Sequence, residues 1–205
     1  MATFATVGGK ITAALFNELV NDVAASGGVS RVVPSSTPGT GNAFNATTGL
    51  VTATASSGVQ IRGVFSSTYT NYRMVYRLTT SASAGFNMTL TTGATEAVTA
   101  YDNQRFTSVS TASSSVLALN TTAMQPDVIS NIGIHSGVIE FFSPAEAVAT
   151  TAISDYFSMP NPGTTAAGGG KSFMQHRTTT AYDGIKFTPY SGTVTGTVQI
   201  YGYTL

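Results

Sequence analysis

From about residue 44 onward, the sequence is a series of short strand-like runs separated by Gly, Ser, Asn and Pro. In the clearest run, residues 71–79, apolar residues such as Tyr72 and Met74 alternate with polar residues such as Arg73. This period of two is that of a half-buried strand. About nine or ten such runs without an intervening helix are typical of an antiparallel β-sandwich or jelly roll. The fold class we predict is therefore mainly β.

The end of the chain predicts a terminal hairpin. Val194, Val198 and Ile200 share one face of the run 193–203, and Ser191 with Gly192 supplies the turn before it. The other strands are expected in the runs 59–65, 71–79, 86–90, 116–120, 132–142, 152–157, 171–178 and 185–190.

Residues 11–25 carry the one convincing helical pattern, which Gly27 and Gly28 would end. The apolar positions of this pattern are Ile11, Leu15, Phe16, Leu19 and Val23. Their spacing fits packing of the short helix against copies of itself around a symmetry axis, and it fits docking on its own domain equally well. We take these residues as the candidate oligomerisation contact.

A Pro- and Gly-rich stretch at residues 33–42 has the composition of a linker. We therefore place a boundary near residue 40. Residues 1–40 would form an N-terminal helix and linker, and residues 41–205 a β-sandwich domain.

The charge composition restricts the partners. Only 9% of residues are charged and the net charge is zero, so the chain lacks the basic stripe of a nucleic-acid footprint. No run approaches the ~18 apolar residues of a membrane span, and we recognise no export signal. The absence of Cys excludes disulfides and Cys-based metal sites. We expect neither nucleic acid nor membrane insertion.

Catalytic and cofactor chemistry finds little support. The acids are scattered, and the two histidines, His135 and His176, lie in predicted strands without ligand-like spacing. A metal would require copies of one histidine to meet on a symmetry axis. Residues 168–172 have a phosphate-loop-like composition but lack the required spacing, so we interpret them as a flexible loop. We expect no enzymatic activity, no cofactor and no resident metal.

Residues 101–105 are the candidate binding site. They combine an aromatic ring with planar polar groups, a mixture that sugar binding often uses, and the contacts would come from Tyr101, Asn103 and Arg105. A plain loop or a subunit contact is the alternative interpretation.

Three segments carry a resemblance to a known class of proteins. They are residues 65–73 with the strand that follows, residues 182–185 with 191–203, and residues 11–17. The first two resemble the C-terminal β domain of tailed-phage fibre and minor structural proteins, and the third resembles the short helix that often opens such proteins.

The resemblance implies a virion component, usually a homotrimer, made in the host cytoplasm without a signal peptide. Its N-terminal segment would attach to other virion proteins and its β domain would project outward. We expect a tail fibre or baseplate-associated protein whose outer loops bind a host surface glycan. The alternative is a capsid head fibre or decoration protein that stabilises the shell.

Overall fold

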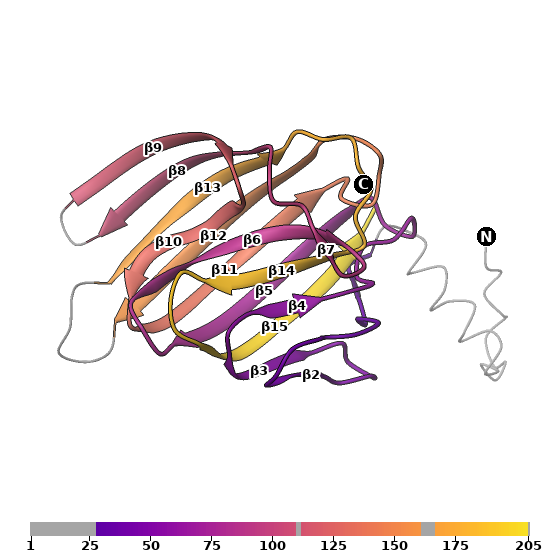
Figure 1. The fold of residues 1–205 in the computed structure, drawn as a ribbon, viewed down its shortest axis with the longest axis horizontal. Helices are drawn as coiled ribbons and strands as arrows, with labels where there is room; N and C mark the ends of the chain where they lie inside the picture. Colours follow the sequence, from indigo (N-terminus) through magenta and orange to yellow (C-terminus); the bar gives the residue numbers. More distant parts are fainter. Residues whose placement is uncertain (1–27, 110–111, 161–166, 205) are drawn as a thin grey trace, which may run out of the picture.

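The computed structural model describes residues 28–109, 112–160 and 167–204, and within them all regular structure is β. The strands form a ten-stranded and a five-stranded antiparallel sheet (Figure 1). The predicted mainly β fold is therefore confirmed. The predicted helix with Ile11, Leu15, Phe16, Leu19 and Val23 lies outside the described residues. In the described ranges, no helix has the length and apolar character that crossing a bilayer requires.

The larger sheet contains most of the long strands. Its spatial order is β2 (Asn42–Phe44), β3 (Val51–Ser56), β15 (Val194–Tyr203), β5 (Asn71–Thr80), β11 (Gly133–Phe142), β12 (Thr150–Pro160), β13 (Gly168–His176), β8 (Tyr101–Val109) and β9 (Ala112–Thr121). The short β1 (Ser30–Arg31) pairs with β15.

The smaller sheet covers one face of the larger one. Its order is β10 (Met124–Asn131), β6 (Ala84–Thr92), β14 (Gly184–Pro189) and β4 (Val59–Ile61), with β7 (Thr95–Glu96) paired to β6. In Figure 1 these strands lie in front of the middle of the larger sheet. The two sheets therefore form two layers with a shared core.

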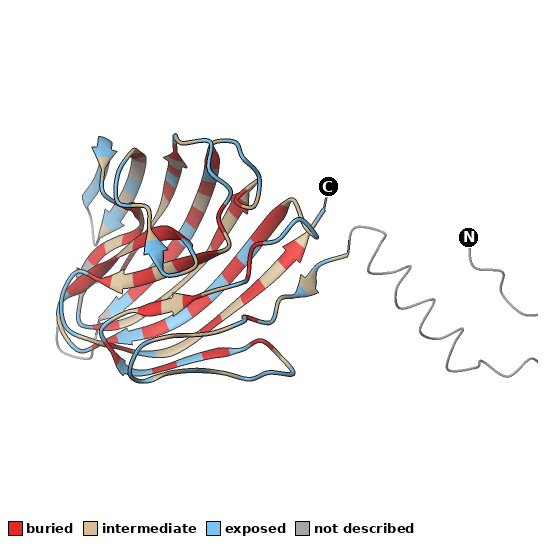
Figure 2. Cartoon of the chain, turned by 45° about the vertical axis from the view of Figure 1, so that its right-hand side comes forward, coloured by how far each residue is buried: buried red, intermediate tan, exposed pale blue. Residues whose placement is uncertain are grey.

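The core lies between the layers, and only one face of each strand contributes to it. Along β5 the even-numbered residues from Tyr72 to Leu78 are buried and the odd-numbered ones are exposed, as the sequence predicted. Bands of buried and less buried residues alternate along the strands in Figure 2. The largest fully buried side chains are Tyr72, Tyr76, Tyr101, Phe86, Phe141 and Phe187.

Most predicted runs coincide with strands, but six strands were not predicted and one predicted loop was wrong. The missed strands are the short β1, β2 and β7 and the longer β3, β8 and β10. Residues 168–172, interpreted as a flexible loop, lie inside β13, where each residue pairs with both β12 and β8.

The described part of the predicted linker is packed on the β domain. β1 pairs with β15, the Val32 amide donates to the Ile200 carbonyl at 2.9 Å, and the Ser35 amide donates to the Arg62 carbonyl at 2.9 Å. Residues of the sandwich therefore begin at about Ser30 rather than after residue 40.

Tyrosine rings lie over glycines of neighbouring strands at several places. A Cβ on Gly137 would lie 2.6 Å from the Tyr76 hydroxyl oxygen, and a Cβ on Gly170 would lie 2.6 Å from that of Tyr156. At Gly202 the three nearest atoms all belong to the Tyr69 ring, the closest at 2.2 Å. Each large ring thus occupies space that only glycine leaves free.

We expect Gly202→Ala to lower the free energy of unfolding by about 1–3 kcal/mol, because the new methyl group would displace the Tyr69 ring. Chemical denaturation measures the change. In a Tyr69→Ala background the same substitution should cost much less, because the ring is gone. Equal costs in both backgrounds would contradict this packing.

Candidate functional site

The residues predicted to contact a glycan lie on the inner face of β8. Residues 101–105 form a strand and not a loop, and the side chains of Tyr101 and Asn103 are fully buried. Arg105 points to the same side and is partly buried. The interpretation of this segment as an exposed binding loop was therefore wrong, since alternation along the strand turns all three residues away from the outer face.

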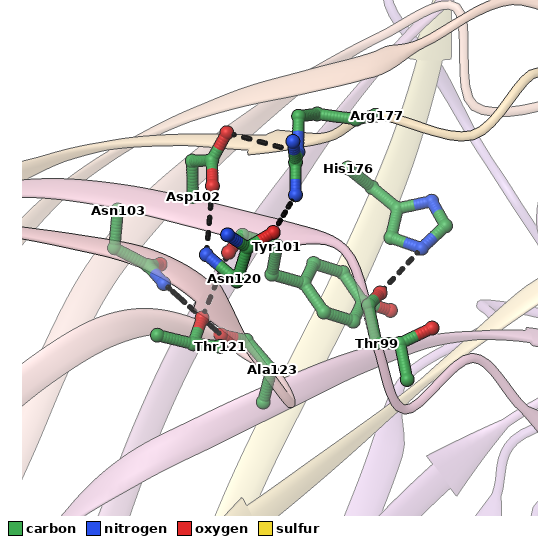
Figure 3. Close-up of polar contacts among 9 residues, drawn as sticks. All are labelled: Thr99, Tyr101, Asp102, Asn103, Asn120, Thr121, Ala123, His176 and Arg177. Atoms are coloured by element: carbon green, nitrogen blue, oxygen red, sulfur yellow. Dashed lines mark hydrogen bonds and ion pairs between the residues drawn. The ribbon is translucent and has the colours of Figure 1, made fainter.

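Tyr101 and Asn103 have structural hydrogen bonds, some of which appear in Figure 3. The Tyr101 hydroxyl accepts from the Leu90 amide and donates to the Ala97 carbonyl, both at 3.0 Å, so it joins β8 to β6. Burial raises the pKa of this hydroxyl well above its usual range. The Asn103 amide nitrogen donates to Thr121 Oγ1 at 2.8 Å and to the Ala123 carbonyl at 3.1 Å. These bonds hold the segment between β9 and β10.

The outer face of the same strand carries Asp102, Gln104 and Phe106. The Arg177 Nε lies 3.1 Å from Asp102 Oδ2, and the Asn120 amide donates to Asp102 Oδ1 at 3.0 Å. Figure 3 shows the Arg177 guanidinium between Asp102 and Asn120. This group fixes the end of β9 on β8, where Asn120 has a positive φ of 55°.

A shallow hollow of about 600 Å³ lies further along this face. We call it the β8–β9 hollow. Its outer-face lining residues are Phe106 and Ser108 of β8, Ser113 and Ser115 of β9, Asp155 of β12, and Gly169 and Lys171 of β13. Phe106 is 45% exposed, and Gly169 has no side chain to cover the floor. An aromatic ring thus stands beside several hydroxyl groups.

The hollow contains one ion pair and no net charge. Lys171 Nζ lies 2.8 Å from Asp155 Oδ1 and donates to Oδ2 at 2.9 Å. Both side chains are largely exposed, so the pair contributes little to stability. Phe106 and Phe173 meet edge to face at 6.1 Å. A ring with nearby acceptors and donors can hold the apolar face of a neutral polar ring and bond its hydroxyls.

The sequence analysis missed these residues because it predicted neither the strand β8 nor which of its side chains point to the outer face. Phe106 directly follows the segment that was singled out, and Lys171 lies in the stretch interpreted as a loop. Polar residues occupy both faces of residues 101–106, so the sequence offers no alternating pattern that would locate this strand.

Both histidines are buried inside the sandwich. His135 Nδ1 lies 2.9 Å from Asp127 Oδ2, and both side chains are fully buried. His176 Nε2 donates to the Thr99 carbonyl at 3.0 Å, which leaves Nδ1 to accept from Thr178 or Tyr182. A symmetry-axis metal site on either histidine is thus contradicted. No cluster of three or more metal-ligating side chains occurs among the described residues.

Comparisons with known proteins show no family for this chain. No protein-family model and no curated protein matches the chain. Among solved structures, a crystal structure of a provisionally assigned pore-forming toxin from Bacteroides vulgatus is 10% identical, and the match covers 83% of this chain and 84% of that one. Its TM-score of 0.13 is too low to show a shared fold.

We expect Tyr101→Phe to lower the free energy of unfolding by about 1–3 kcal/mol, because the buried Leu90 amide would lose its acceptor. Denaturant unfolding measures this loss. Ligand binding at the outer face should be unchanged in the folded variant. An unchanged free energy of unfolding would contradict a structural role for the hydrogen bond between the Leu90 amide and the Tyr101 hydroxyl.

Burial lowers the pKa of His176 below its ordinary value of 6.5. Below that pH the unfolded chain binds more protons at this residue than the folded chain, so we expect stability to fall as the pH falls. One such group contributes at most about 1.4 kcal/mol per pH unit. Urea unfolding at pH 7.5 and pH 5 should show a smaller decrease in His176→Gln than in the wild type. An identical decrease in stability in the two proteins would contradict the assignment of this pH dependence to His176.

Proposed function

We propose that this chain is a structural protein of a tailed-phage virion, as a tail fibre or baseplate-associated fibre, and that the β8–β9 hollow binds a host surface glycan. The resemblance of residues 65–73 and 191–203 to fibre β domains supports the first part. The second part moves the expected glycan contact from Tyr101, Asn103 and Arg105 to the opposite face of the same strand.

The observation that carries the glycan proposal is the exposed Phe106 ring beside a hydroxyl-rich wall and a carboxylate. Ser113 and Ser115 line one side of the hollow, and Asp155 with Lys171 lines the other. Carboxylate and hydroxyl oxygens accept hydrogen bonds from sugar hydroxyls, and the ammonium group donates to sugar oxygens. Binding clefts commonly combine apolar rings with a few such polar groups. The neutral surface suits an uncharged glycan better than an anionic one.

Several parts of this proposal rest on the sequence. They are the jelly-roll form of the sandwich, attachment to other virion proteins through the N-terminal segment, a homotrimer through Ile11, Leu15, Phe16, Leu19 and Val23, and the absence of enzymatic activity. The virion location belongs with them.

A capsid head fibre or decoration protein is the second candidate. The outer face of the larger sheet exposes Phe157, Phe173 and Leu117 by 46%, 42% and 60%. Side chains of this kind suit contact with another protein. Electron microscopy of particles with a labelled C-terminus separates the candidates, because a tail-tip label favours the fibre and a label over the head favours decoration.

We expect Phe106→Ala to reduce binding of the purified protein to host cells or to isolated host surface glycan by tenfold or more, while its unfolding curve stays close to that of the wild type. The matched control is Phe157→Ala, which removes an equally exposed ring from the same sheet face outside the hollow. Wild-type binding by Phe106→Ala would contradict the glycan proposal.

A further inference from the structure

In the part of the chain that the structure describes, β9 is an edge strand of the larger sheet. It is ten residues long and pairs with β8 along one side. No described strand pairs with its other side, and Figure 1 shows it at the margin of the sheet, at the end opposite β2. An edge of this length presents a row of backbone donors and acceptors that another strand can bind.

The other sheet edges are protected in the usual ways. β2 and β4 are three residues long. β10 contains Pro126, and its pairing with β6 has two register shifts. Short strands, proline and bulges are the devices that keep edges from pairing with other chains. β9 has no proline and no charged residue, and its one irregularity lies at its end beside Tyr101 and Asn103.

The side chains of β9 are exposed on both faces of the sheet. Leu117 and Leu119 are 60% and 59% exposed on the outer face, and Val116 is 42% exposed on the other. The run therefore combines exposed apolar side chains at Val116, Leu117 and Leu119 with zero charge. An edge of this kind in a free monomer is a site of association.

We propose that β9 pairs antiparallel with β9 of a second copy of this chain, across a two-fold axis perpendicular to the sheet. The strand suits its own copy because it carries no charge, so self-pairing places no like charges opposite each other. A register centred on Ala118 puts Leu117 of each copy opposite Leu119 of the other, on the outer face. Such a contact is isologous, because both copies contribute the same strand. It stops at two copies, because the pairing uses the free edge of each.

The pairing joins the two larger sheets with their outer faces on the same side. Ser113 and Ser115 of each β8–β9 hollow belong to β9, so the two hollows would lie on either side of the axis on one continuous face. The contact itself depends only on β9 and not on what the hollow binds. The β9 contact is also distinct from the predicted three-fold contact of the N-terminal segment. The two contacts together would give an assembly of six copies.

Cysteine crosslinking tests the register, because the chain has no cysteine of its own. Opposite residues in an antiparallel pair have Cβ atoms about 4.5–5.5 Å apart, which is near the spacing of a disulfide. Ala118→Cys should therefore form a disulfide-linked dimer under mild oxidation. The matched control is Ala43→Cys on β2, the edge at the other end of the sheet. Equal crosslinking of the two variants would overturn the proposal.

Light scattering tests the contact without crosslinking. The wild type should contain an even number of copies, and the variant Leu117→Lys/Leu119→Lys should have half the wild-type molar mass, because four lysines would face one another. Val98→Lys, at another exposed apolar residue, is the matched control and should keep the wild-type mass. Circular dichroism verifies that each variant is folded. A wild type with an odd number of copies, or a folded double variant with the wild-type mass, would overturn the proposal.

Discussion

Face-to-face packing of the five-stranded sheet on the ten-stranded sheet is the interaction on which the rest of the structure depends. It buries Phe86 and Phe187 of the smaller sheet against Tyr76 of the larger one, with ring centroids 6.3 and 5.1 Å from that of Tyr76. Each large apolar side chain buried in this way contributes about 1.5–3 kcal/mol. The Asp127–His135 pair also crosses between the layers, and loss of one partner would deprive a buried polar group of this bond, at a cost of about 1–3 kcal/mol. The packing therefore fixes which face of every strand is interior.

The same packing leaves the other face of the larger sheet uncovered by any described residue. The exposed Phe106 and the β8–β9 hollow lie on this face, and β9 ends the sheet beside them. Because the smaller sheet packs on the opposite face, outer residues such as Phe106 do not support the core and can serve recognition, whereas Asp102 and Arg177 hold β9 on β8. Both proposals, the glycan site and the contact between copies, depend on an inner face that forms the core and an outer face that stays exposed.

Periodicity in the sequence predicted the strands whose two faces differ strongly. β5 is the clearest case, since large apolar residues from Tyr72 to Leu78 alternate with polar ones. β8 could not be found in this way, because polar residues occupy both faces. Asn103 is tolerated inside only because Thr121 and Ala123, about 20 positions later, supply its partners. β10 was hidden by Pro126 and the buried Asp127, whose partner His135 lies on another strand. Contacts of this range leave no periodic trace in the sequence.

Thiol accessibility of single-cysteine variants tests the assignment of the two faces most directly, since the chain has no cysteine of its own. Ser172→Cys on β13 places a thiol on the inner face at a fully buried position, and Ser108→Cys on β8 places one on the outer face at an exposed position. Both substitutions nearly preserve side-chain size. The account predicts that a thiol reagent labels residue 108 at the rate of the unfolded chain and labels residue 172 only after unfolding. Rapid labelling of residue 172 in the folded protein would contradict it.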